Sequence, residues 1–304
     1  MPAASTILMI RPAAFSFNEQ TAANNFFQSQ PKLQASEIQQ QVLDEFDNMT
    51  RLLVEQDIEV LVIEDTPEPA KPDAIFPNNW FCTLPSGIIA VFPMFAANRR
   101  IEKRDDILQW LTENFQTTGV QDWSEYEAEG RFLEGTGSMV IDHDNKIIYA
   151  CRSQRTDTSV LEKFASAHGY HALAFSAADQ NGRPIYHTNV MMCIGNGFAV
   201  VCADAIADET ERIAVTQLLE STGHDIIRIS LQQMHAFAGN MLQLQNMRGE
   251  LFIVLSASAW NSLREDQHNQ LQSFAQPLVI DVPTIEKIEG GSVRCMMAEI
   301  FLKA

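Results

Sequence analysis

The sequence has no apolar run of the roughly 18 residues that a membrane-spanning helix needs. Its first residues, Met1-Pro2-Ala3-Ala4-Ser5, also lack the basic segment and long apolar stretch of a secretory signal. Both absences predict a cytoplasmic protein that has no place in a membrane.

Basic residues are few, because 21 Lys and Arg stand against 39 Asp and Glu, for a formal net charge of −18. A field of that sign repels phosphate backbones and anionic lipids, so nucleic acid and membrane surfaces are not expected as partners. The acidic excess is typical of a solvated surface, and it can also attract a cationic or zwitterionic small molecule. With 46% hydrophobic and 20% charged residues, the composition indicates a globular protein with a large core, and it leaves a homo-oligomer open.

Cysteines are also scarce, and their odd number and wide spacing predict no disulfide framework. The absence of C-x-x-C and H-E-x-x-H spacings predicts no metal site. Cys295 follows the pair Gly290-Gly291, which suggests a close approach of the backbone to another group. The other cysteines lie in apolar, strand-like runs and are interpreted as core residues in a reducing compartment: Cys82, Cys151, Cys193 and Cys202.

A repeated pattern organises most of the chain. Each unit has two short strands joined by a turn sequence, then an amphipathic helix, then a third short apolar run. The hairpins recur at intervals of roughly fifty residues, the spacing of a repeat architecture. They start near residues 80, 138, 190, 241 and 292, and the helices are expected at 104–115, 159–168, 208–223 and, from a weaker pattern, 258–274.

The fifth unit ends with a strand predicted at Ser292–Leu302, and its missing parts are expected at the other end of the chain. These are a strand at Thr6–Ile10, an amphipathic helix at Ser36–Gln56 and a closing strand at Ile58–Ile63. A fifth unit shared between both termini predicts a closed ring, which also removes exposed sheet edges. We therefore expect one domain over residues 1–304, an α/β protein built as a five-bladed pseudo-symmetric propeller of ββαβ repeats.

Polar residues and glycines stand at the start of every hairpin. In a five-fold ring, equivalent positions of successive units meet at the central axis, so residues far apart in sequence are expected to line one pocket. These positions hold Asn78-Asn79, Glu134-Gly135, His187-x-Asn189, Gly239-Asn240 and Gly290-Gly291 with Cys295.

Cys295 is the candidate nucleophile of that pocket. A free thiol has a pKa of about 8.5, and a neighbouring imidazolium can stabilise the thiolate and later act as acid or base. His187 is the first candidate for this role because it stands at the start of a repeat, and His235 is the second. Glu134, between apolar residues and glycines, is expected to be partly buried and to orient the histidine or hold the substrate. The alternative for Glu134 is an ordinary turn carboxylate.

Arg155 is the candidate for binding a substrate carboxylate, because the guanidinium fork matches the two oxygens of that group. A surface arginine at the start of a helix is the alternative. The polar segment Asn18–Gln30, just after the first strand, is compatible with a lid over the pocket.

Four segments together resemble the guanidine-modifying (pentein) superfamily, which includes arginine deiminase, dimethylarginine dimethylaminohydrolase, succinylarginine dihydrolase and the amidinotransferases. The likeness covers the whole chain with the motifs in family order, and it is nearest to the bacterial group described as amidinotransferases or citrulline-utilisation hydrolases. The segments are Phe132-Leu133-Glu134-Gly135-Thr136-Gly137, Ser153-Gln154-Arg155-Thr156, His187-x-Asn189 and Gly290-Gly291-Ser292-Val293-Arg294-Cys295.

The resemblance implies a five-bladed α/β propeller and a covalent mechanism without metal or cofactor. Cys295 would attack the amidine or ureido carbon of an amino-acid substrate, and His187 would protonate the leaving nitrogen and then activate water. Glu134 would pair with His187 or with a substrate nitrogen. Arg155 would bind the substrate α-carboxylate, and Asn240 joins it among the substrate-binding candidates.

Asn79 and Asn189 depart from the family pattern for cationic substrates, since such members usually place an aspartate at the first position and many place one at the second. An amide does not offset the charge of a guanidinium group, but it can donate to the oxygen and accept from the N–H of a neutral ureido group. The main hypothesis is therefore hydrolysis of citrulline to ornithine, ammonia and carbon dioxide. Asp73 weakens this reasoning if it supplies a carboxylate, although it can instead be a structural or α-amino-binding group.

Two alternatives stay open at this point. The enzymatic alternative is arginine deiminase-like, dimethylarginine hydrolase-like or amidinotransferase activity. The non-enzymatic alternative is a ring-shaped binding protein, because ribosome-associated factors share this propeller.

Overall fold

The computed structural model describes residues 3–31 and 33–304. Within these ranges the strands form five small sheets of three strands each, which confirms the predicted α/β class. In every sheet the middle strand pairs antiparallel with one neighbour and parallel with the other. The sheets are β3 (Phe81–Thr83), β4 (Ile88–Val91) and β5 (Gly119–Asp122); β6 (Val140–Asp142), β7 (Ile147–Cys151) and β8 (His171–Phe175); β9 (Met192–Gly195), β10 (Phe198–Val201) and β11 (Asp225–Arg228); β12 (Leu242–Gln245), β13 (Leu251–Ser256) and β14 (Gln276–Ile280); and β15 (Ala298–Ile300), β1 (Thr6–Arg11) and β2 (Glu59–Glu64).

The last of these sheets combines the two ends of the chain. Strand β1 pairs antiparallel with β15, in the register Thr6 to Ile300, and parallel with β2, in the register Thr6 to Glu59. The sequence predicts a long strand over Ser292–Leu302, and this is wrong in extent, because only Ala298–Ile300 is extended. The preceding residues form a short helical turn instead.

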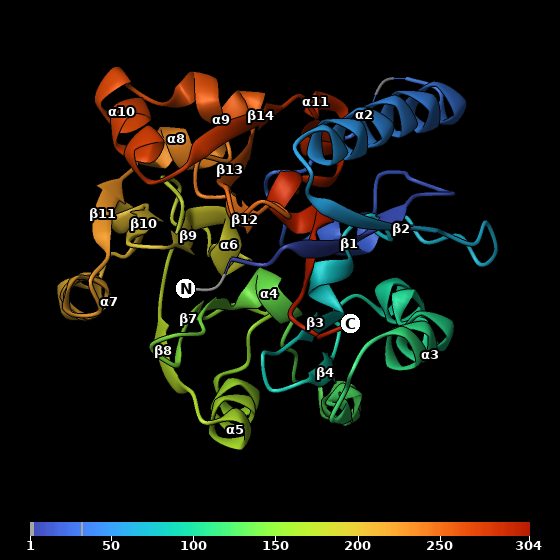
Figure 1. Ribbon diagram of the computed structural model, residues 1–304, viewed down its shortest axis with the longest axis horizontal. Coiled ribbons are helices and arrows are strands. Elements are labelled where there is room, and N and C mark those ends of the chain that lie inside the picture. Colours follow the sequence, from blue (N-terminus) through green and yellow to red (C-terminus); the bar gives the residue numbers. More distant parts are fainter. Residues whose placement is uncertain (1–2, 32) are drawn as a thin grey trace.

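Helices occupy the parallel crossovers and lie at the periphery of the molecule (Figure 1). The longest, α2 (Ala35–Glu55), buries one residue per helical turn against the sheet: Ile38, Val42, Phe46, Met49 and Leu53. The pattern over 258–274 predicts one helix, which is wrong, because Leu263 has an extended backbone and separates two helices. The remaining crossover helices are α3 (Asp105–Asn114), α5 (Thr158–His168), α7 (Glu209–Ser221), α9 (Ala257–Ser262) and α10 (Glu265–Phe274).

The first strand of each hairpin lies toward the centre of the arrangement (Figure 1). Strands β6 and β12 both contact β9, and β15 contacts β3. Ala4 bridges to Leu244 and so links the sheet of β1 to that of β12. These contacts order the sheets as expected for a propeller and bring the starts of all five hairpins together.

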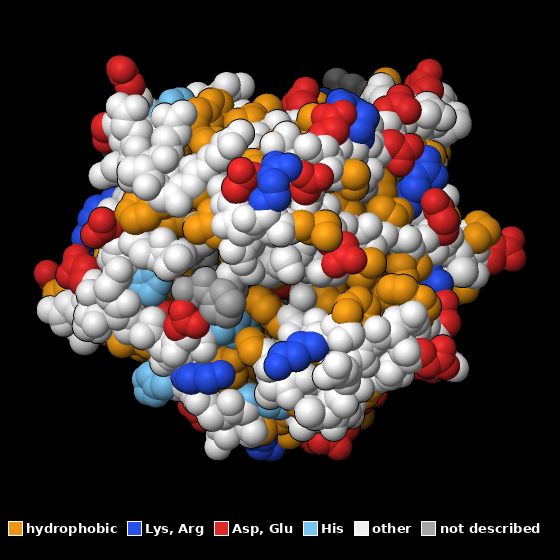
Figure 2. Space-filling view, viewed as in Figure 1, with side chains coloured by type: hydrophobic (Ala, Val, Ile, Leu, Met, Phe, Trp, Pro, Cys, Tyr) orange, Lys and Arg blue, Asp and Glu red, His pale blue; other side chains and the backbone are white. Residues whose placement is uncertain are grey.

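On one face of the molecule the acidic side chains are distributed rather than concentrated. Figure 2 shows Asp and Glu side chains spread around the rim of one face, interspersed with basic and uncharged groups. Among the described residues, no helix is long and apolar enough to cross a membrane, and no three His, Cys, Asp or Glu side chains are grouped to hold a metal ion.

Candidate active site

Short helical turns at the starts of the hairpins carry most of the predicted site residues. Asn79 ends the turn η1 (Pro77–Asn79), Glu134 precedes α4 (Gly135–Ser138), and His187 precedes α6 (Thr188–Met191), which contains Asn189. Cys295 lies in the turn η5 (Val293–Met296), so the expectation that a β-type run presents the sulfur is wrong.

Cys295 is only 3% exposed, and two amide groups contact its sulfur. Asn240 Nδ2 lies 3.3 Å from Sγ and Asn189 Nδ2 lies 3.5 Å from it. Asn240 is held in place because its Nδ2 also donates to the Asn189 carbonyl and its Oδ1 accepts from the Arg294 N–H. Two N–H donors directed at the sulfur stabilise negative charge as it develops there.

His187 and Glu134 form a buried pair, with 2.8 Å between Nε2 and the carboxylate Oε2. Burial alone would raise the pKa of Glu134, but the Arg155 guanidinium and the hydrogen bond to His187 hold this pKa well below its usual range. Burial lowers the pKa of His187 to about 4, although the carboxylate opposes this. The imidazole is therefore neutral at pH 7 and ready to accept a proton, and it is not the resting imidazolium that the sequence suggested.

Arg155 is 2% exposed, so the alternative of a surface arginine is wrong. Its guanidinium lies 3.4 Å from Glu134 and over the ring of Tyr186, 5.0 Å from the centroid. Two of its nitrogens donate to Asn24 Oδ1, at 2.5 and 3.0 Å. The amide oxygen of Asn24 thus occupies a position where a substrate carboxylate could bind.

A pocket joins these groups, with about 270 Å³ of space not occupied by atoms, part of it open to solvent. Glu134 lies behind His187 and is fully buried, while Asn189 and Asn240 reach the sulfur from the side. His235 is not part of this pocket, because it stacks on Phe27 at a separate surface. The predicted residues that line the pocket are Asp73, Asn79, Arg155, His187 and Cys295.

The family model of eukaryotic N,N dimethylarginine dimethylhydrolase matches residues 11–302. The chain belongs to this family. The match confirms the guanidine-modifying superfamily that the four motifs predicted. No curated protein sequence matches the chain.

Solved structures of this fold include the arginine dihydrolase ArgZ from cyanobacteria, with a TM-score of 0.73 and 15% identity over 96% of this chain. The chain spans 40% of the ArgZ chain. A variant of AgrE in complex with L-arginine gives a TM-score of 0.72 and 16% identity, over 96% of this chain and 39% of that one. A dimethylarginine dimethylaminohydrolase with S-methyl-L-thiocitrulline gives a TM-score of 0.67 and 16% identity, over 98% and 100% of the two chains. At these identities the likeness shows the shared fold.

In this dimethylarginine hydrolase family member, sequence reasoning missed a buried ionic cluster beside the sulfur. Arg99 is 2% exposed and donates to Glu102 through two nitrogens at 2.9 Å each, and its Nε lies 3.2 Å from Asp73. Its Nη1 also donates to Asn79 Oδ1 at 2.9 Å. The only sequence signal was an Arg and a Glu three residues apart, which is ordinary for an exposed helical turn.

The segment of residues 18–28, which follows β1 and is called the covering segment below, lies over the pocket and lines it with Thr21 and Asn25. Asn18 donates to Glu289 through its backbone N–H and to Asp73 through its side chain, both at 2.9 Å. Gln28 Nε2 donates to the other oxygen of Glu289 at 2.5 Å. Burial and the neighbouring charge of Asp73 raise the pKa of Glu289. These polar contacts hold the segment over the pocket, together with ring contacts of Phe27 with Tyr186, His235 and Phe237.

Proposed function

We propose that the protein hydrolyses citrulline to ornithine, ammonia and carbon dioxide through a covalent intermediate on Cys295. The observation that carries the proposal is the set of amides around the sulfur, together with the pairing of Asp73 by Arg99. A guanidinium group entering beside Cys295 would meet the Arg99 cation, and the amides that contact the sulfur do not offset its charge. A neutral ureido group carries no such cost, and an amide can donate to its oxygen.

The first half of the reaction transfers the substrate carbon to sulfur. The thiol proton of Cys295 passes to the neutral His187 as Sγ attacks the ureido carbon, and the C–O double bond opens to a tetrahedral adduct. The amide donors beside Sγ support the developing charge. His187 then gives its proton to the terminal nitrogen, the C–N bond breaks, and ammonia leaves a thiocarbamate on Cys295.

The second half regenerates the thiol. His187 takes a proton from water, which attacks the thiocarbamate carbon, and the C–S bond breaks as the sulfur recovers the proton. The released carbamate of ornithine loses carbon dioxide. Glu134 acts through His187, because its carboxylate fixes the ring orientation and stabilises the imidazolium that forms in each half.

Binding of the amino-acid end requires the covering segment to yield. The substrate α-carboxylate would replace Asn24 on Arg155 in a bidentate pair. Asp73 Oδ1 is buried and receives no hydrogen bond from the described donors, so it suits the α-ammonium group.

A second candidate function is hydrolysis of a guanidino amino acid such as arginine or a methylated arginine. It is favoured by the family name, which specifies dimethylarginine, and by ArgZ, which is described as an arginine dihydrolase. Amidinotransfer differs only in the acceptor that attacks the intermediate.

A substrate panel of citrulline, arginine, methylarginines and succinylarginine, with identification of the products, tests the proposal. Citrulline should yield ornithine, and Cys295→Ala should abolish this activity. Cys202→Ala is the matched control, because Cys202 is equally buried in β-sheet surroundings but outside the pocket. Turnover of arginine with inert citrulline would refute the proposed substrate and leave the covalent mechanism standing.

A further inference from the structure

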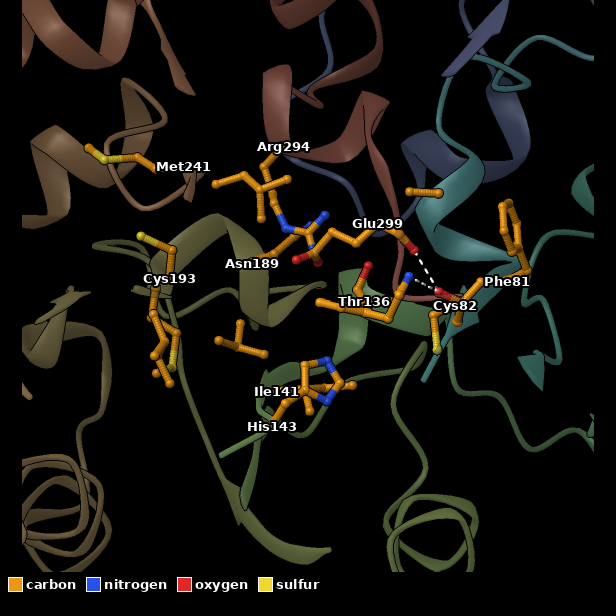
Figure 3. Close-up of a pocket in the computed structure, with 17 residues that line it drawn as sticks. Phe81, Cys82, Thr136, Ile141, His143, Asn189, Cys193, Met241, Arg294 and Glu299 are labelled. Atoms are coloured by element: carbon orange, nitrogen blue, oxygen red, sulfur yellow. Dashed lines mark hydrogen bonds and ion pairs between the residues drawn. The ribbon is translucent and has the colours of Figure 1, made fainter. Parts of the chain in front are cut away.

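A second cavity is lined by residues of all five sheets (Figure 3). It shares no lining residue with the pocket that contains Cys295 and Arg155, which we call the amino-acid pocket. The first strand of every sheet contributes to its wall, through Cys82, Ile141, Cys193, Leu242 and Ala298. Four of these strands lead from a segment that carries a site residue into the hairpin turn of their sheet, and β15 leads from the turn of Cys295 toward the C-terminus. The cavity therefore extends from the active site toward the face that carries the turns.

Asn189 connects the two spaces. Its Nδ2 contacts the sulfur of Cys295 at 3.5 Å, while the side chain also lines the second cavity. The residue is 1% exposed, and its Oδ1 has no hydrogen-bond partner among the described residues. A buried acceptor without a donor is costly, so it indicates a place where a small hydrogen-bond donor binds.

The size and charge of the cavity define what can occupy it. It holds about 580 Å³ of space not occupied by atoms, part of it open to solvent. The charged groups Arg294 and Glu299 pair at 2.9 Å and so leave the wall without net charge. At the far end, His143 packs on Phe301 with 4.7 Å between ring centroids. A passage with a neutral wall suits an uncharged small molecule such as water or ammonia.

We propose that this axial cavity binds the ammonia released at Cys295 and conducts it to the face of the hairpin turns. The inference rests on the proposed C–N hydrolysis, in which His187 protonates the terminal nitrogen as its bond to carbon breaks and neutral NH3 leaves. The Asn189 Oδ1 accepts a hydrogen bond from this NH3. The axial route lets ammonia leave before the thiocarbamate is hydrolysed and without passing the covering segment, which hydrogen bonds to Glu289 hold over the pocket.

Opposite changes of size at Ile141 test this route, because its side chain lines the cavity and lies outside the amino-acid pocket. The enzyme is supplied with substrate and ¹⁵N-ammonium, and ¹⁵N in the unreacted substrate is measured. By reversal of the first step, medium ammonia that reaches the thiocarbamate is incorporated. The quantity compared is the rate of ¹⁵N incorporation divided by the rate of turnover. Ile141→Phe should lower this ratio by about fivefold or more, and Ile141→Ala should raise it. The KM for the substrate should stay unchanged in both variants.

A second readout decides the matter where wild-type incorporation is undetectable. The kcat for a substrate with a methylated terminal nitrogen, which releases methylamine, is compared with that for the unmodified substrate. Ile141→Ala should raise this ratio and Ile141→Phe should lower it, since methylamine needs the wider path. Cys193→Met on the facing wall replaces Ile141→Phe if that variant does not fold.

Equal incorporation and equal kcat ratios in the narrowed, widened and wild-type proteins would overturn the axial route. A rise in KM in both variants would assign Ile141 a structural role and would also overturn it. If the wild type consumes arginine and leaves citrulline untouched, the proposed substrate fails, and the same measurement with arginine still tests the route.

Discussion

Amides rather than charged groups surround the sulfur of Cys295. Asn189 and Asn240 donate toward Sγ, and Asn79 is engaged by Arg99. Glu134 pairs with His187 and Arg155, and Glu102 pairs with Arg99. The groups that contact the sulfur are therefore uncharged, while Glu134 can support proton transfer through His187.

The protonation of His187 predicts an unusually acidic limb in the pH profile. Burial lowers the pKa of this imidazole to about 4, and only the neutral form can take the thiol proton. Activity is thus present above the folded-state pKa and is lost as pH falls through about 4. The measurement is kcat/KM between about pH 3 and pH 8, and an acid limb centred on the ordinary histidine value near 6.5 would contradict the assignment.

Glu134→Gln should lower kcat by about 10²–10⁴-fold, because the imidazolium that forms on His187 loses its carboxylate. It should also destabilise the fold by about 3–5 kcal/mol, since Arg155 is left as a buried unpaired cation. Glu102→Gln is the matched control, a fully buried acid paired with Arg99 and not with His187. The kcat and the free energy of urea unfolding are measured for both variants. Equal losses of kcat would show that Glu134 contributes to the stability of the fold and not to catalysis.

Asn79→Asp should shift the substrate preference toward guanidino compounds. The new carboxylate would neutralise part of the Arg99 field and offset a guanidinium charge beside Cys295. The ratio of kcat/KM for arginine over citrulline should rise by at least about tenfold, equivalent to about 1.4 kcal/mol. An unchanged ratio in a folded variant would mean that this amide does not select the substrate.

At the scale of elements, the two glycines before Cys295 let other segments approach. Gly290 ends α11 (Pro283–Glu289) with a φ of +63°, and a Cβ there would lie 2.7 Å from Phe27 Cβ and 2.8 Å from Asn25 Oδ1 in the covering segment. A Cβ on Gly291 would lie 2.7 Å from the ring of Phe76. The absence of side chains at Gly290 and Gly291 thus lets the covering segment and the loop before η1 pack against the turn that carries Cys295.

Gly290→Ala should therefore displace the covering segment and raise KM by about tenfold, because the clasp on Glu289 would no longer close. Gly249→Ala is the matched control, since Gly249 has a similar left-handed φ of +84° but its Cβ would meet only Gln245 Nε2 at 3.5 Å. Both variants should lose about 1 kcal/mol from backbone strain. A similar KM in the two variants would show that the segment does not control substrate binding.

At the scale of the molecule, strand β15 completes a sheet whose other strands come from the opposite end of the chain. It pairs with β1 and also contacts β3, where Thr83 Oγ1 donates to the Glu299 carbonyl and accepts from the Phe301 N–H. A chain that stops after Met297 should lose cooperative unfolding in circular dichroism, because β1 would have one open edge inside the molecule.

A chain that stops after Leu302 is the control for this truncation, since Lys303 and Ala304 are exposed and bond only to Gln116. Its Tm should fall by no more than about 5 °C. Cooperative unfolding of the shorter chain at a similar Tm would show that β15 is dispensable.

Local sequence patterns determined the repeat, the α/β class and the residues that face the centre. Hairpin turns, helical periodicity and the roughly fifty-residue interval are local signals, and a five-fold arrangement converts them into a shared position for Asn79, Glu134, His187 and Cys295. The hydrophobic periodicity predicted the wrong secondary structure where non-local contacts decide it. It missed the break between two helices at Leu263, and it predicted a strand where Cys295 lies in a helical turn.

Only the tertiary structure decided the electrostatics and the openings of the site. Segments distant in sequence bury Arg99 and Arg155 and decide which carboxylate each one contacts. The same burial removes water from His187 and makes the imidazole neutral. The axial cavity likewise exists only because five first strands surround one axis, and no single strand records it. Sequence periodicity reports which side of an element is buried, while the groups that share a buried space are set by how all the elements pack together.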